Sequence, residues 1–119
     1  MKTTLVIGAS TNTERYSNKC IKLLTEHKIK TFAIGNKEGT AYTINIQTGF
    51  PHFTNINTVA IYLSPKNQEG YYDYLISLKP QRIIFPPGTE NPDFEIKARA
   101  NGIITEQACP LVMLNVGTY

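Results

Sequence analysis

The sequence predicts a three-layer α/β domain in which helices cover both faces of a five-stranded parallel sheet. Short apolar, β-branched segments alternate with segments whose apolar residues recur at helical spacing. Four of the five strand-like segments are followed by Gly, Ser or Pro, as is typical of buried parallel strands. The chain has 119 residues, 41% of them hydrophobic, which fits one domain over residues 1–119 with its own core.

The first strand and the first helix are predicted within residues 3–27. Residues 3–7 form a short β-branched run, which Gly8, Ala9 and Ser10 end. After a polar loop, one face of a helix is indicated by the spacing of Cys20, Leu23, Leu24 and His27. We expect Ser17 or Asn18 to cap this helix, because such side chains accept hydrogen bonds from free backbone amides.

Two further strands are predicted on either side of a stretch without a clear pattern. Residues 30–34 form the second strand, which Gly35 ends, and residues 58–63 form the third. Between them, two glycines and a proline interrupt a β-prone run in residues 38–57. This stretch is interpreted either as a loop or as a small hairpin.

The second helix is predicted to begin at Ser64 and Pro65, a favoured N-cap and first-turn pair. Its apolar face consists of Tyr71, Tyr74, Leu75 and Leu78. We expect the helix to end near Lys79, just before Pro80.

The fourth strand, residues 82–85, is ended by the Pro-Pro-Gly of residues 86–88. A third helix then begins at residues 91–93, where an acid lies in the first turn, and ends at Asn101 and Gly102. Residues 103–105 form the fifth strand, and the tail from residue 109 forms one more helical turn. Because βαβ connections are right-handed, we expect a Rossmann-like domain with strand order 3-2-1-4-5.

A ligand of such a sheet binds outside the carboxyl ends of the strands, where the winding reverses. With the expected order, this point lies between strands one and four. Four loops rich in Gly, Ser, Asn or Pro meet there, and they are residues 8–17, 35–38, 63–66 and 86–91.

The first of these loops has the groups that bind a diphosphate. Gly8 lacks a Cβ, Ser10 offers a hydroxyl, and the next helix presents free backbone amides at its positive end. Arg15 can bind phosphate oxygens through two nitrogens. The alternative is structural: Gly8 only ends a strand and Arg15 only contacts solvent.

A dinucleotide enzyme normally has G-x-G-x-x-G after the first strand and an acid after the second. Both features are absent here, since Gly8 is followed by Ala-Ser-Thr-Asn-Thr and strand two ends in Gly-Asn-Lys. Lys37 suits a ribose that carries a phosphate, as in coenzyme A or NADP. Its alternative is a solvated loop lysine.

The chain resembles the small stand-alone CoA-binding proteins and is similar to the CoA-binding domain of the succinyl-CoA synthetase alpha subunit. The resemblance covers nearly the whole chain. It depends on the motifs at residues 6–10 with 15–17, 62–65, 82–91 and 106–110.

The resemblance implies a role for thirteen residues in binding coenzyme A. The diphosphate would be held by Gly8, Ala9, Ser10, Arg15, Tyr16 and Ser17. The adenosine and its 3′-phosphate would lie near Asn36 and Lys37, the adenine would be flanked by Leu63, Ser64 and Pro65, and the pantetheine arm would run toward Pro87 and Gly88.

The titratable residues do not indicate a catalytic or metal centre. His27 falls on a predicted helix and His52 in the stretch without a clear pattern, so both are interpreted as structural or surface residues. Cys109 follows the fifth strand at the end where the ligand is expected. It is interpreted as a small buried hydrophobe, with thiol–disulfide exchange with the cofactor as the alternative.

Three functions are therefore considered: a non-catalytic coenzyme A binding protein, an NADP- or acyl-CoA-dependent enzyme subunit, and a protein interaction domain with a vestigial nucleotide pocket. The net charge of +3 is spread along the chain, which argues against nucleic-acid binding. The sequence has neither a signal peptide nor an apolar run of the roughly 20 residues that span a bilayer, so we expect a cytoplasmic protein without a membrane partner. Exposed edge strands and three tyrosines of the second helix are compatible with a homodimer or an unknown protein partner.

Overall fold

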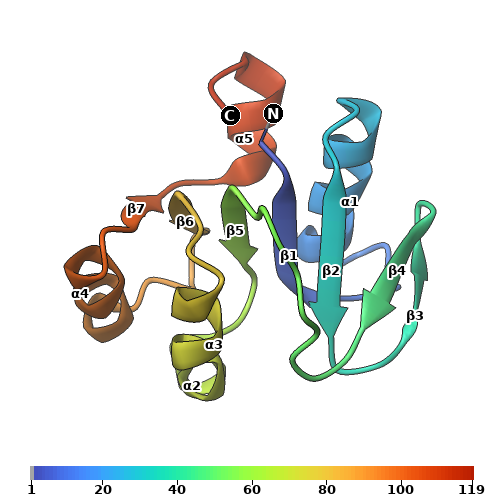
Figure 1. Ribbon diagram of the computed structural model, residues 1–119. Coiled ribbons are helices and arrows are strands. Elements are labelled where there is room, and N and C mark those ends of the chain that lie inside the picture. The colour runs from blue at the N-terminus through green and yellow to red at the C-terminus, as the bar shows by residue number, and fades with distance from the viewer. Residues whose placement is uncertain (1) are drawn as a thin grey trace.

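The computed structural model describes residues 2–119 and has the three layers that the sequence predicts, a central sheet with helices on both faces (Figure 1). The strands are β1 Thr4–Ala9, β2 Thr31–Gly35, β3 Gly39–Ala41, β4 Ile44–Gln47, β5 Thr58–Ile61, β6 Arg82–Phe85 and β7 Ile104–Gln107. The helices are α1 Tyr16–Glu26, α2 Pro65–Gln68, α3 Tyr72–Ser77, α4 Pro92–Ala100 and α5 Pro110–Val116, with the 3₁₀ turn η1 Glu69–Tyr71 between α2 and α3.

The expected strand number and order were wrong. The described sheet has seven strands in the order β3-β4-β2-β1-β5-β6-β7, and only the β3–β4 pair is antiparallel. The five predicted strands are β1, β2, β5, β6 and β7, so their order is 2-1-3-4-5 instead of 3-2-1-4-5. The winding reverses between β1 and β5, and not between strands one and four as expected.

The reason for this order is a hairpin within residues 38–57. Its strand β4 pairs in parallel with β2 and takes the place beside β2 where the third predicted strand was expected, while β3 forms the edge of the sheet. The chain then returns over β2, where the Phe53 ring packs on Phe32 with 4.7 Å between centroids. Hydrogen bonds from the backbone amides of residues 57 and 58 to the Thr3 carbonyl place β5 on the free side of β1.

The core lies on both faces of the sheet. On one face, alternate strand residues pack against Leu75 of α3 and Phe94 and Ala98 of α4. On the other face, the strands pack against α1, with Leu114 of α5 beside it. Because every second residue of the central strands is apolar on each face, β1, β5 and β6 are buried throughout or nearly so.

Two of the expected helix boundaries were wrong. Helix α1 begins at Tyr16 with Arg15 as its N-cap, and not at Ser17 or Asn18. Both of those residues are buried, and the Asn18 side chain donates to the Ser10 carbonyl instead of capping the helix. The expected single helix over residues 64–79 is broken by the 3₁₀ turn that contains Gly70, a poor helix former. The predicted α4 was confirmed, and the Asn91 side chain caps it by accepting from the Phe94 amide at 3.2 Å.

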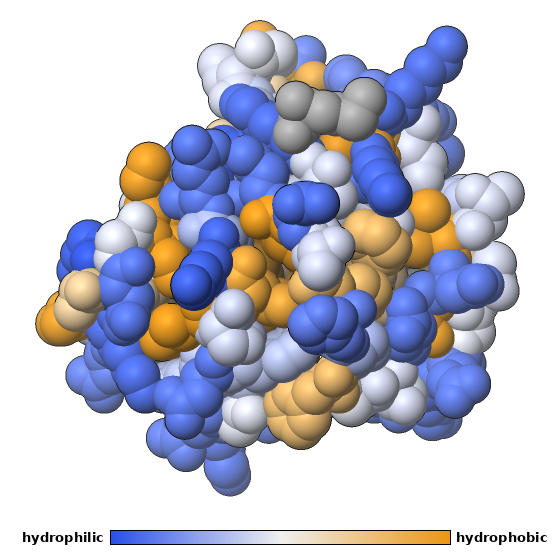
Figure 2. Space-filling model, in the orientation of Figure 1, coloured by the Kyte–Doolittle hydropathy of each residue, from blue (hydrophilic) through white to orange (hydrophobic). Residues whose placement is uncertain are grey.

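The helices of residues 2–119 are all too short or too polar to cross a membrane. Figure 2 shows a mostly hydrophilic face with separate apolar islands.

Candidate functional site

The carboxyl ends of β1 and β5 meet at the point where the winding reverses, and Gly8 lies against the residue that follows β5. Its φ is +89°, and a Cβ at this position would lie 2.3 Å from the Tyr62 carbonyl oxygen. The register of β1 against β2 shifts at the same place, between Ile7 and Ala9. A side chain is therefore excluded at Gly8 by conformation and by space.

The loop from β1 to α1 is ordered by hydrogen bonds within it. The Ser10 hydroxyl accepts from the Asn12 amide at 3.0 Å, and the Asn12 side chain accepts from the Glu14 amide at 3.0 Å. The Asn12 carbonyl accepts from the Arg15 amide at 3.0 Å. These hydrogen bonds order the residues that lead into α1. The first backbone amides of α1, like those of any helix, have no partner within the helix. The start of α1 therefore has backbone N–H groups of the kind that bind anions in other proteins.

The residues predicted for the diphosphate lie around this loop but differ in exposure. Arg15 is exposed, and Tyr16 is 68% exposed, so both side chains are free to meet a ligand. Ser17 is buried, so its side chain is not exposed to a ligand. Ala9 and Ser10 lie at the end of β1 and at the start of the loop.

The end of β2 lies beside this loop. A Cβ at Gly35 would lie 2.3 Å from the Ala9 carbonyl oxygen, so the two strands approach unusually closely here. Asn36 and Lys37 follow directly and are exposed. The structure thus places these two predicted residues next to the β1–α1 loop.

The ends of β5 and β6 are joined by a buried glutamine that the sequence analysis missed. The Gln68 side chain is 0% exposed and donates to the carbonyls of Leu63 and Thr89, both at 2.8 Å. Its oxygen accepts from the Asn91 side chain at 3.0 Å. Gln68 therefore fixes the loop after β5 against the loop after β6. Its helical position gave no signal, because a glutamine there is ordinarily solvated.

The remaining predicted residues belong to these two loops. Ser64 and Pro65 are exposed at the start of α2, beside the half-buried Leu63. Pro87 and Gly88 are exposed in the turn after β6, where the Gly88 amide donates to the Glu90 carboxylate at 2.8 Å. All four predicted loops follow strands that end at this edge of the sheet.

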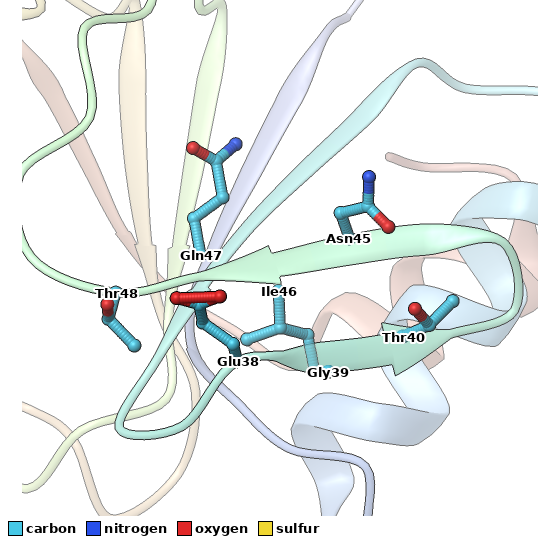
Figure 3. Close-up of a pocket in the computed structure, with 7 residues that line it drawn as sticks. All are labelled: Glu38, Gly39, Thr40, Asn45, Ile46, Gln47 and Thr48. Atoms are coloured by element: carbon cyan, nitrogen blue, oxygen red, sulfur yellow. The ribbon is translucent and has the colours of Figure 1, made fainter.

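A hollow lies on the β3–β4 hairpin, which follows the loop after β2. It measures about 500 Å³ and is lined by Glu38, Gly39, Thr40, Asn45, Ile46, Gln47 and Thr48. Figure 3 shows Glu38 near Gln47 and Thr48 at one end, with Thr40 and Asn45 toward the hairpin turn. A second hollow of about 380 Å³ includes Gln47, Phe32 and His52. The thirteen predicted site residues line neither hollow.

No group of three His, Cys, Asp or Glu side chains able to hold a metal occurs within residues 2–119. The two cysteines are free, Cys20 buried and Cys109 half-buried at the N-cap of α5. Within residues 2–119, the buried Tyr62 hydroxyl has no hydrogen-bond partner. Burial raises the pKa of Tyr62, and the nearby Cys20 and Cys109 thiols raise it further.

Burial also raises the pKa of the Cys20 thiol from 9.0 to about 12. Since the thiolate is the reactive form, we expect native reduced protein to react with Ellman's reagent at pH 8 through Cys109 alone. One thiol per chain should react before unfolding and two after it, and Cys109→Ser should lower the native value to zero. Fast reaction of two thiols in the native protein would contradict the buried position of Cys20.

A mainly parallel sheet with helices on both faces and a glycine loop at the winding reversal defines the class of doubly wound α/β proteins. A family model described as CoA binding domain matches residues 2–115. The chain therefore belongs to the family of CoA-binding domains, as the resemblance implied.

Solved structures agree with this fold. A crystal structure of an uncharacterized protein is 39% identical, with a TM-score of 0.97 over 100% of this chain and 98% of that chain. A hypothetical protein from Pyrococcus horikoshii OT3 is 22% identical, with a TM-score of 0.87 over 97% and 82% of the two chains. A Thermus thermophilus protein is 16% identical, with a TM-score of 0.88 over 99% and 90%. No curated protein matches the chain.

Proposed function

We propose that the chain binds coenzyme A with the diphosphate at the β1–α1 loop, and that it acts as one binding domain without catalysis. Membership of the CoA-binding family supports the ligand. The observation that carries the location is Gly8, because its positive φ and its contact with the Tyr62 carbonyl bring a backbone free of side chains to the winding reversal. Ligands of open α/β sheets bind at this point.

The groups at this loop fit a diphosphate. The space that a Cβ at Gly8 would fill is occupied by the Tyr62 carbonyl, so the loop stays close to the sheet. The start of α1 has no side-chain cap. The first turn of α1 contains no acid, so the positive end of the helix is not neutralised by its own residues. The exposed Arg15 adds a planar guanidinium for two phosphate oxygens.

The rest of the cofactor would lie along the same edge of the sheet. We assign the adenosine and its 3′-phosphate to Asn36 and Lys37, because both are exposed next to the β1–α1 loop. The adenine would be flanked by Leu63, Ser64 and Pro65. The pantetheine arm would run toward Pro87 and Gly88, which follow β6 on the far side of β5.

The test is a calorimetric titration of reduced protein with coenzyme A, with dephospho-coenzyme A and NADP as competitors. We expect Arg15→Ala to weaken coenzyme A binding about tenfold, because a charge-assisted hydrogen bond contributes about 1.5 kcal/mol. Arg99→Ala is the matched control, since Arg99 is an exposed arginine on α4 that bonds to Thr105. Dephospho-coenzyme A should bind more weakly than coenzyme A.

Three results would argue against the proposal. Failure of the wild-type protein to bind coenzyme A would exclude the function. Equal losses in Arg15→Ala and Arg99→Ala would show a general effect of charge and exclude the proposed location. Tighter binding of NADP than of coenzyme A would favour the dinucleotide alternative.

A further inference from the structure

The turn that joins β3 and β4 is strained. Tyr42 and Thr43 are its two central residues, and their φ angles are +50° and +71°. Two-residue hairpin turns of this kind normally use Asn and Gly, because a side chain with a branched β-carbon resists positive φ. A strained conformation persists only where surrounding contacts maintain it, so the contacts of this turn are informative.

Those contacts lead from the hairpin to the β1–α1 loop. The Tyr42 hydroxyl donates to the side-chain oxygen of Asn18 at 2.7 Å, and the Asn18 side-chain nitrogen donates to the Ser10 carbonyl at 2.9 Å. Asn18 is 2% exposed, so neither of its polar atoms has ready access to water. The hairpin also meets the loop directly, since a Cβ at Gly39 would lie 2.7 Å from the Thr11 methyl group.

The bond from Asn18 fixes the orientation of the peptide between Ser10 and Thr11. In a trans peptide the carbonyl and the following N–H point in opposite directions. Because the Ser10 carbonyl points toward the Asn18 side chain, the Thr11 N–H points away from Asn18. The structure gives this N–H no acceptor among residues 2–119, which leaves it free for a ligand.

We propose that Tyr42 is a positioning residue, which acts through Asn18 to keep the Thr11 N–H directed at the diphosphate. This inference rests on the proposed function. Without the Tyr42 hydroxyl, the buried oxygen of Asn18 lacks a donor, and the amide turns to find one. The Ser10 carbonyl is then released, and the peptide can present an oxygen to the phosphates in place of an N–H.

The test compares two variants that each lose one tyrosine hydroxyl. Tyr42→Phe should weaken coenzyme A binding about fivefold in calorimetric titration, the range expected for one hydrogen bond. Tyr74→Phe is the matched control, because the Tyr74 hydroxyl donates to the Pro51 carbonyl at 2.6 Å on the other face of the sheet. It should lose a similar amount of stability and bind coenzyme A with wild-type affinity.

A double-variant cycle separates positioning from general destabilisation. In protein that already carries Asn18→Ala, adding Tyr42→Phe should cause no further loss of affinity, since the route to Ser10 is gone. The Thr11 amide resonance should shift on titration with coenzyme A in the wild type and shift less in Tyr42→Phe.

The outcomes distinguish this inference from the proposed function. Wild-type protein that binds no coenzyme A overturns the proposed function and this inference with it. Wild-type binding together with unchanged affinity in Tyr42→Phe, or additive losses in the double variant, overturns the positioning role alone.

Discussion

Replacing Gly8 by alanine is expected to lower the free energy of unfolding by about 3 kcal/mol and to abolish coenzyme A binding. The positive φ of +89° costs a residue with a side chain about 1–2 kcal/mol. The new Cβ would also lie 2.3 Å from the Tyr62 carbonyl oxygen, and overlap of this kind costs about 1–3 kcal/mol. Relief of the overlap must separate β1 from the end of β5, which displaces the loop that is proposed to hold the diphosphate.

The matched control for stability is Gly88→Ala. Gly88 has nearly the same φ, +90°, but a Cβ there would have no neighbour within 4 Å. This variant should lose only the conformational part, about 1 kcal/mol. Urea unfolding of both variants measures the difference. Equal losses would show that the contact between Gly8 and Tyr62 contributes nothing.

Most of the secondary structure could be predicted because its signals are local. The five strands recognised in the sequence are short buried runs, and four of them are followed by Gly, Pro or Ser within three residues. The hairpin could not be predicted as firmly, because its turn uses Tyr42 and Thr43 at positive φ. Neither residue type favours that conformation, and the contact that maintains it, Tyr42 to Asn18, joins residues far apart in sequence.

The order of the strands could not be predicted from the same signals. A buried run shows that both faces of a strand are covered, but it does not show which strand lies beside it. Right-handed crossovers allow β5 beside either β1 or β2, and the place beside β2 is taken by β4. The edge that holds the candidate site was still predicted, because every parallel strand ends there whatever its neighbours.

The candidate site likewise contains residues that could be recognised from the sequence and residues that could not. Gly8 was recognised because a glycine at the end of a buried strand is visible in the sequence. Asn18 and Gln68 were missed as structural residues of the site, since a buried amide on a helix looks like a solvated one. Their partners, Ser10 and Thr89, lie in other loops, so only the tertiary structure shows what these amides fix.

Gln68→Leu is expected to lower the free energy of unfolding by about 3 kcal/mol. Leucine keeps most of the volume but leaves the buried carbonyls of Leu63 and Thr89 and the Asn91 amide without this partner. Each buried polar group left unpaired costs about 1–3 kcal/mol, and the Asn91 amide keeps a second partner in Tyr72. Because the loops after β5 and β6 lose their link, coenzyme A affinity should fall as well.

Gln81→Leu is the matched control, because the exposed Gln81 accepts one hydrogen bond from Asn57, at 2.8 Å. The same change of side chain there should alter stability by no more than about 0.5 kcal/mol. Urea unfolding gives both values, and titration of the folded Gln68→Leu protein with coenzyme A gives the effect on binding. A loss in Gln68→Leu no larger than in Gln81→Leu would mean that water replaces the three hydrogen bonds, and the loops after β5 and β6 would then be held by their apolar contacts alone.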